Sequence, residues 1–248
     1  MAKAKDKEVM VMSIENYPML QGKASDVLEA MKANFEGEEV SKRDVFKEIP
    51  NGKGEDYWTI QTEDGKQTVE ELTGVILYIG NERALFEGEW GKGSNIPLCT
   101  SPDGIMGTGN PGMSCRDCVE KDFGPNSETP KCSQKKPIYA LIPEINPVLP
   151  VVFYVAPTSF PNLKKFRAFT AQYGIQFHDL EVKFTLKPGR TKNNMDTSIL
   201  NFETISNIKK TNPEAYDKII AFRKTFLPFM APASIAPPEE TGNVQKAA

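Results

Sequence analysis

The 248-residue sequence predicts an α+β fold that consists mostly of antiparallel strands with flanking helices. Segments in which polar and apolar residues alternate are separated by turn residues, as in antiparallel sheets. Other segments repeat apolar residues at helical spacing. Apolar residues make up 39% of the chain and charged residues 25%, which is typical of a globular protein and excludes a disordered or fibrous one. No apolar run approaches the ~18 residues that span a membrane.

The N-terminal third predicts two helices followed by strands. Residues 25–35 place Val27, Met31 and Phe35 on one helical face, and Ser25 is a suitable N-cap. The elements expected after this helix are a short helix at 41–49, a strand at 56–62, and a hairpin of strands 73–80 and 83–90 around Gly80.

The C-terminal half predicts two more helices and four strands. One helix ends at Gly174 and the other begins near Pro213, which is the punctuation typical of helices. The expected elements are strands 136–143 and 149–157, helix 158–174, strands 180–189 and 198–208, and helix 212–229.

The elements divide the chain into three expected regions. Residues 1–55 form an acidic, helical N-terminal segment, and residues 56–226 form the β core. A turn-rich insertion at 96–135 interrupts this core. Residues 227–248 have too few bulky residues to pack, so we expect a disordered tail there.

All four cysteines lie in this insertion, in the spacing Cys99-x15-Cys115-x2-Cys118-x13-Cys132. Four soft ligands suit a tetrahedral zinc ion, and a C-x2-C pair supplies two of them from one turn. The first residues lack the apolar stretch of a signal peptide, so we expect a cytoplasmic protein, in which thiolates on a metal are more common than disulfides. The alternatives are unligated core cysteines or disulfides. We expect structural zinc, because four thiolates leave no open coordination position for catalysis.

The sequence contains no catalytic motif that we recognise. A hydrolase triad needs a histidine base, and the single histidine, His178, has no nucleophile motif near it. The glycine-rich residues 104–112 lack the Lys-Ser/Thr of a phosphate-binding loop. Asp103, between Pro102 and Gly104, is expected in a β-turn. The sequence therefore favours a protein that is not an enzyme.

The net charge of −3 hides a separation of charge along the chain. Residues 1–98 carry 12 Lys/Arg and 19 Asp/Glu, whereas residues 160–224 carry 12 and 6. Positive charge mixed with aromatic rings is typical of proteins that bind single-stranded nucleic acid, often on an OB-type barrel. The helical spacing of Phe166, Phe169 and Tyr173 favours a place for these rings in the core, and the lysines could equally belong to a solvated face. The candidate phosphate ligands are Lys164, Lys165, Arg167, Lys183, Lys187, Arg190 and Lys192, and the candidate stacking rings are Tyr139 and Tyr154.

Residues 58–190 contain a longer pattern: C-x-S-P-D-G, then C-x2-C, F-G and the last cysteine, followed by P-T-S at a helix start. In these residues the chain resembles a family of proteins from bacteriophages and mobile elements. It is similar in plan to phage single-stranded-DNA-binding proteins in which a zinc ribbon is inserted in an OB-type fold. The resemblance implies an OB-like core in which aromatic and basic residues hold the strand. The acidic tail by which such proteins recruit replication partners is reduced here to Glu239 and Glu240.

Two functions are expected from these observations. The first is a phage-type single-stranded-DNA-binding protein with structural zinc, which acts in DNA replication or recombination in the host cytoplasm. Its partners would be single-stranded DNA and replication or recombination proteins. The alternative is a zinc-ribbon interaction module that binds a host or phage protein, such as RNA polymerase or a defence factor, through its acidic N-terminal part. A virion structural part has only the resemblance in its favour.

Overall fold

The computed structural model describes residues 12–36, 38, 45–50, 52–62, 65–87, 96–125, 128–191 and 194–232. At its centre lies a mostly antiparallel sheet in the order β11-β10-β4-β8-β9-β1, in which only β1 and β9 are parallel. Helices accompany this sheet, so the fold is α+β, as the sequence predicts. The strands are β1 (Lys47–Ile49), β4 (Glu71–Ile79), β8 (Cys132–Leu141), β9 (Val151–Val155), β10 (Leu180–Arg190) and β11 (Asp196–Asn207).

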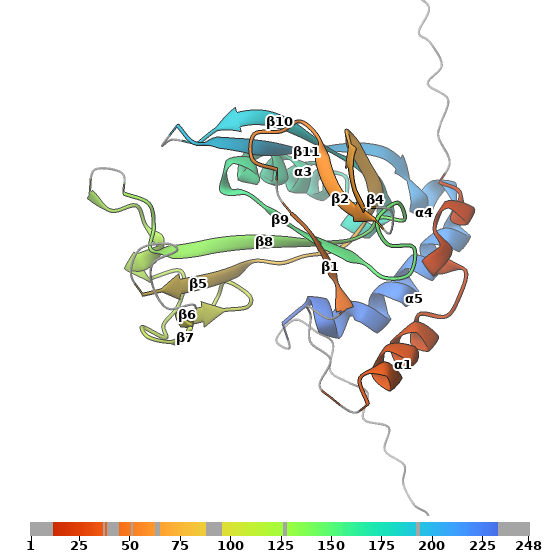
Figure 1. The fold of residues 1–248 in the computed structure, drawn as a ribbon, viewed down its shortest axis with the longest axis horizontal. Coiled ribbons are helices and arrows are strands. Elements are labelled where there is room, and N and C mark those ends of the chain that lie inside the picture. The colour runs from red at the N-terminus through yellow and green to blue at the C-terminus, as the bar shows by residue number, and fades with distance from the viewer. Residues whose placement is uncertain are drawn as a thin grey trace, which may run out of the picture.

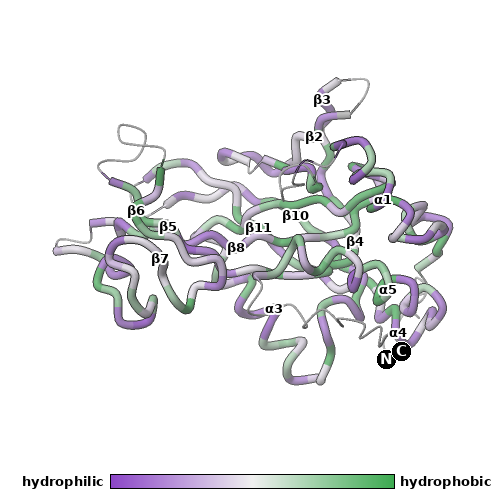
Figure 2. The backbone as a smooth tube through the Cα atoms, turned by 90° about the horizontal axis from the view of Figure 1, so that it is seen from below, coloured by the Kyte–Doolittle hydropathy of each residue, from purple (hydrophilic) through white to green (hydrophobic). Residues whose placement is uncertain are grey.

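Both faces of the sheet are covered (Figure 1). Trp58, Leu163 and Phe166 pack with strand residues on one face, which lies under the hairpin β2 (Trp58–Thr62) and β3 (Gly65–Val69) and under α3 (Phe160–Gln172). Tyr17, Ile219 and others pack on the opposite face. Because the central strands are buried on both sides, their residues are almost continuously hydrophobic (Figure 2). The elements on the opposite face are η1 (Ile14–Asn16), η2 (Pro18–Leu20), α1 (Ala24–Asn34), α4 (Ile208–Thr211) and α5 (Pro213–Met230).

Strands β4 and β5 (Glu82–Phe86) follow one another along the same edge of β8. Ile79 pairs with Ile138 in the second half of β8, and Leu85 pairs with Cys132 in the first half. The expected hairpin around Gly80 is therefore wrong. The Gly80 N–H donates to the Pro137 carbonyl at 2.8 Å, so hydrogen bonding continues across the junction. A side chain at Gly80 would come within 2.7 Å of the Pro137 ring, which explains why a glycine allows this close approach.

The cysteines lie where β5 carries the sheet beyond its covered centre. The order β8-β5-β6-β7 adds two short strands, β6 (Pro97–Ser101) and β7 (Thr108–Gly109), before the turn η3 (Val119–Lys121). We call residues 96–125 the cysteine lobe. Figure 1 shows it at the end of the molecule opposite α1 and α5. The lobe is thus continuous with the sheet through its strand pairing.

The structure corrects three sequence-based expectations. The edge strands β1 and β11 do not pair with each other in the described residues, so the sheet is open and the expected OB-like barrel is not formed. Lys47–Ile49 forms β1 instead of the end of a helix over 41–49, because it pairs with β9; residues 41–44 lie outside the described residues. Helix α5 continues to Met230, past the expected start of the tail at 227, and residues 233–248 lie outside the described residues.

In the part of the chain that the structure describes, no helix is long and apolar enough to cross a membrane. The longest, α5, has 18 residues and is amphipathic. Its buried residues, which include Ile219, Phe222 and Phe226, face the sheet. The helix α5 therefore packs its apolar side on the core of the protein.

Candidate metal centre and basic surfaces

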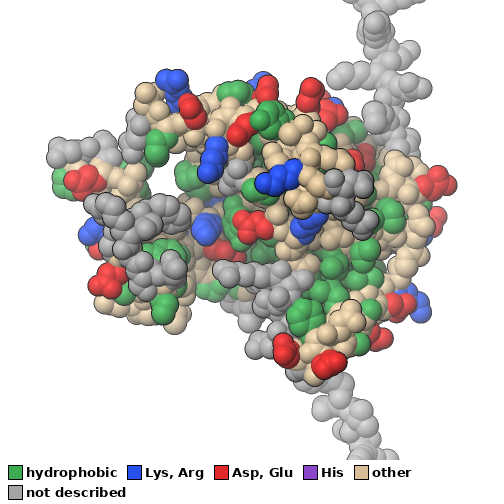
Figure 3. Space-filling view, in the orientation of Figure 1, with side chains coloured by type: hydrophobic (Ala, Val, Ile, Leu, Met, Phe, Trp, Pro, Cys, Tyr) green, Lys and Arg blue, Asp and Glu red, His purple; other side chains and the backbone are tan. Residues whose placement is uncertain are grey.

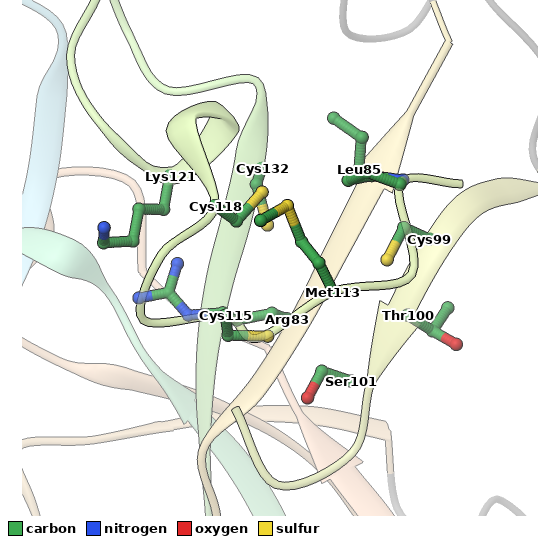
Figure 4. A pocket seen from close by; sticks show the side chains of 11 residues that line it. Arg83, Leu85, Cys99, Thr100, Ser101, Met113, Cys115, Cys118, Lys121 and Cys132 are labelled. Atoms are coloured by element: carbon green, nitrogen blue, oxygen red, sulfur yellow. The ribbon is translucent and has the colours of Figure 1, made fainter. Parts of the chain in front are cut away.

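All four cysteines line one pocket, at which the cysteine lobe meets the start of β8. Cys115 and Cys118 are buried, and Cys99 and Cys132 are partly buried. Figure 4 shows their side chains around a common space that also holds the side chain of Met113. This space measures about 20 Å³, which is room for one atom-sized ligand. Residues that are up to 33 positions apart are thus brought together at one point.

Strand pairing fixes the positions of the first and last cysteine. Leu85 pairs with Cys99 on β6 and with Cys132 on β8, so all three side chains project from the same face of the sheet. Two strand spacings separate the two cysteine backbones, which amounts to ~10 Å. The relative position of Cys99 and Cys132 follows from the way the strands pair, and the spacing of the cysteines along the sequence does not reveal it.

The C-x2-C pair is held by a tight turn. The Ser114 carbonyl accepts hydrogen bonds from the backbone N–H groups of Asp117 and Cys118, both at 3.1 Å. Gly107 lies directly beside the thiol of Cys99, where a Cβ atom would come within 2.7 Å of Sγ. Gly107 therefore permits close packing around the thiol of Cys99.

Four cysteine thiols are the right kind of ligand for zinc, but their side chains stand farther apart than a bound zinc ion requires. A tetrahedral zinc ion with bonds of about 2.3 Å needs sulfur atoms about 3.8 Å apart. No group of three or more candidate ligands in the described residues lies close enough to hold a metal ion as the side chains stand. Zinc at this point would require the thiols of Cys99 and Cys132 to approach each other over Leu85.

Two cations line the same pocket, Arg83 and Lys121. Burial raises the pKa of the Cys132 thiol, and a hydrogen bond from Arg83 opposes this rise. A zinc ion with four thiolates has a net charge of −2, because zinc supplies only two positive charges. Arg83 and Lys121 therefore lie where they would offset that excess charge.

His178 and Asp103 have structural roles. The ring of His178 stacks on Tyr216 of α5, with ring centroids 6.2 Å apart, and does not line the cysteine pocket. The Asp103 carboxylate accepts hydrogen bonds from the Ile105 N–H at 2.8 Å and from the Ser101 hydroxyl at 3.1 Å. Asp103 thus stabilises the bend at residues 102–105.

The basic residues predicted to bind phosphate lie on two sides of the sheet. Lys164, Lys165 and Arg167 belong to α3, which covers one face. Lys183 and Lys187 alternate along β10 with the side chains buried beneath α3, so they project from the opposite face. On the side shown in Figure 3, Lys and Arg side chains lie among Asp and Glu side chains and do not form one continuous patch.

Two of the cations that were predicted to bind phosphate form ion pairs within the protein instead. Lys183 pairs with Glu71 at 2.8 Å, and Arg190 pairs with Asp196 at 3.5 Å. Lys192 lies outside the described residues. Among the described residues, the predicted cations that form no ion pair are Lys164, Lys165, Arg167 and Lys187.

The predicted stacking rings do not offer open faces. Tyr139 is only 2% exposed, because it packs against Phe46 with ring centroids 4.8 Å apart, so its prediction as an exposed ring is wrong. Tyr154 is partly buried, and Lys135 Nζ lies 5.5 Å from its ring centroid.

The structure reveals two exposed rings that the sequence pattern favoured as core residues. Phe169 and Tyr173 are 39% and 68% exposed, and their ring centroids are 5.1 Å apart. They follow Lys165 at successive steps of four residues, so the three side chains lie along one flank of α3. The signal in the sequence was this spacing, which differs in phase from the buried pair Leu163 and Phe166.

Comparison with known proteins gives no relative from which a function can be transferred. No protein family model, curated protein or solved structure matches this chain. The function must therefore be inferred from the fold and from the chemistry of the residues described above.

Proposed function

We propose that this chain is a single-stranded-DNA-binding protein without enzymatic activity. The observation that carries the proposal is the surface of α3. This helix presents Lys164 and Lys165 without ion pairs in the described residues, and it exposes the rings of Phe169 and Tyr173. Lysines neutralise phosphates, and exposed rings stack on bases irrespective of sequence. One short helix thus combines both elements of single-strand binding.

The proposal includes a structural zinc ion at Cys99, Cys115, Cys118 and Cys132. Its support is the convergence of the four thiols on one pocket and the scarcity of buried side chains in the cysteine lobe. Zinc contributes on the order of 10 kcal/mol to small domains that fold around it. Such a contribution would compensate for the missing hydrophobic core of this lobe.

The biological setting follows from the resemblance to phage and mobile-element proteins. A protein of this plan would act in DNA replication or recombination in the cytoplasm of a bacterial host. In this chain the basic region is residues 160–224, which carry 12 Lys/Arg and 6 Asp/Glu. This region includes α3 and β10, whose basic side chains are described above. Replication or recombination proteins are its proposed protein partners.

A second candidate function is a protein-interaction module for a host or phage protein. The observation that favours it is a group of exposed large apolar side chains in the cysteine lobe. Contiguous exposed apolar surface marks sites of protein association. The exposed residues are Ile96, Leu98, Ile105, Met106, Met113, Val119 and Phe123.

Fluorescence anisotropy of labelled oligo-dT distinguishes the two functions. The zinc-loaded protein is titrated against the oligonucleotide at several NaCl concentrations, with a duplex of the same length as the control. We expect tight binding of the single strand that weakens steeply as salt rises, because phosphate binding releases counterions. Equal affinity for the duplex would show that the protein does not prefer single strands. No binding at low salt would exclude single-strand binding and direct attention to the apolar lobe.

Ring substitutions test the observation that carries the proposal. Phe169→Ala with Tyr173→Ala should weaken oligo-dT binding at least about fivefold, since each stacked base contributes about 1–3 kcal/mol. Tyr57→Ala is the matched control, because Tyr57 is as exposed as Phe169, at 39%, but lies near the β2–β3 hairpin. The circular dichroism spectra of both variants should match that of the wild type. A similar loss of affinity in the control would mean that the effect is not specific to α3.

A further inference from the structure

Three cations that belong to separate elements lie on the same face of the sheet: Arg83 on β5, Lys136 on β8 and Arg167 on α3. Arg83 pairs with Gln134, and Lys136 lies two residues further along β8, so both side chains project from one face. Ile138, two residues beyond Lys136, lies on this face and belongs to the same hydrophobic cluster as Leu163 of α3. We call Arg83, Lys136 and Arg167 the basic strip.

The basic strip lies between the cysteine pocket and α3. Arg83 lines the pocket and hydrogen-bonds to Cys132, which fixes one end of the strip. At the other end, Lys136 Nζ lies 4.7 Å from the ring centroid of Phe160, the first residue of α3. Phe160 and Arg167 are seven residues apart on this helix, so they lie on the same flank. The strip therefore runs from the cysteine pocket to the flank of α3 that carries Phe160, Lys164 and Arg167.

Within the described residues, the three cations lack acidic partners. No ion pair joins any of them to a carboxylate in the described residues. The Nε atom of Arg167 is buried and has no hydrogen-bond partner among these residues. Burial lowers the pKa of Lys136, and the charges of Arg167 and Arg83 lower it further. Unpaired cations of this kind repel one another, so the arrangement costs stability unless an anion binds between them.

We propose that the basic strip binds the phosphate backbone of the single strand where the strand passes between the cysteine lobe and α3. This inference rests on the proposed function and adds Arg83 and Lys136 to its binding residues. The phosphates would supply the negative charge that no ion pair in the described residues provides to these cations. Arg83 would contact both the strand and the metal-bound thiolates, so that its position depends on the metal centre.

Paired substitutions at the two cations that do not line the cysteine pocket test the inference. The variant carries Lys136→Gln and Arg167→Gln, and the control carries Lys209→Gln, which removes another lysine that lies over a ring, 5.4 Å from that of Tyr216. Oligo-dT binding is measured by anisotropy across a NaCl series, together with zinc content and thermal unfolding. We expect at least about tenfold weaker binding and a salt slope smaller by about 1.4, or about 0.7 for each phosphate that the variant no longer neutralises. The unfolding temperature should stay the same or rise, because unpaired charges are removed.

The outcomes separate the inference from the proposed function. If the wild type binds oligo-dT and the double variant keeps its affinity and slope, the strip has no phosphate role although the proposed function stands. If the wild type does not bind at low salt, both are wrong. If the double variant does not fold, Lys136→Met replaces it, since its side chain still packs on Phe160; its slope should fall by about 0.7. An unchanged slope for that variant would also overturn the inference.

Discussion

At the scale of single residues, hydrogen bonds compensate only partly for the burial of the Glu181 carboxylate. Glu181 on β10 is 8% exposed and accepts hydrogen bonds from Tyr17 at 3.1 Å and from Ser206 at 3.3 Å. Burial raises the pKa of Glu181 above its usual range, although these two hydrogen bonds oppose the rise. Burial also raises the pKa values of Tyr17 and Glu144, and the charge of Glu181 adds to both. The ionised form of Glu181 therefore costs folding free energy.

Glu181→Gln should stabilise the fold at pH 7 by about 1 kcal/mol, because the amide oxygen keeps an acceptor for Tyr17 and carries no charge. The folded protein protonates Glu181 at a higher pH than the unfolded chain does. Lowering the pH through this raised pKa toward 4.5 removes the unfavourable charge from the wild type, so the advantage of the variant should shrink. Urea unfolding between pH 7 and pH 4 measures this difference. A constant difference over that range would contradict a buried ionised Glu181.

At the scale of elements, the sequence predicts most helices and strands and the pairing of β10 with β11, but not how the other strands pair. Polar and apolar alternation identifies β10 and β11, and Pro213 marks the start of α5, where Asn212 accepts a capping hydrogen bond from Ala215. The pattern around Gly80 is equally compatible with a hairpin and with two strands in line, and only pairing with β8 distinguishes them. Strand β1 is too short to show periodicity, so it depends on its partner β9.

The cysteine lobe is an element that we expect to depend on its metal. Cys115→Ser should abolish stoichiometric zinc binding, because serine offers no thiolate. Without zinc, backbone amides in the lobe should exchange with deuterium quickly, while those of β4 and β10 stay protected by the covered centre of the sheet. Hydrogen exchange with mass spectrometry and a zinc assay test this prediction together.

Met113→Leu serves as the control for that substitution. Met113 lines the same pocket but is 41% exposed and is not among the expected ligands. This variant should therefore keep its zinc and the exchange pattern of the wild type. Stoichiometric zinc in Cys115→Ser would show that the four cysteines do not act as one site.

At the scale of the whole molecule, the sheet determines which charges can act together. The sequence predicts one basic surface from residues 164–192, because these residues are close along the chain. The sheet instead places Lys187 on the face opposite α3 and brings Arg83 to the side of Arg167, 84 positions away along the chain. Local sequence patterns predicted the four cysteines as a cluster, whereas the basic strip depends on long-range strand register and was therefore not predicted.

This arrangement predicts that lysines on the two sides of the sheet have unequal effects on DNA binding. Lys164 lies three residues before Arg167 on α3, on the side of the basic strip, whereas Lys187 lies on the opposite face. Neither forms an ion pair in the described part of the chain. Lys164→Glu should weaken oligo-dT binding about tenfold and reduce the salt slope by about 0.7, while Lys187→Glu should change both little. Both lysines are exposed, so neither variant should unfold, and a larger decrease in affinity for Lys187→Glu would place the strand along β10 and β11 instead.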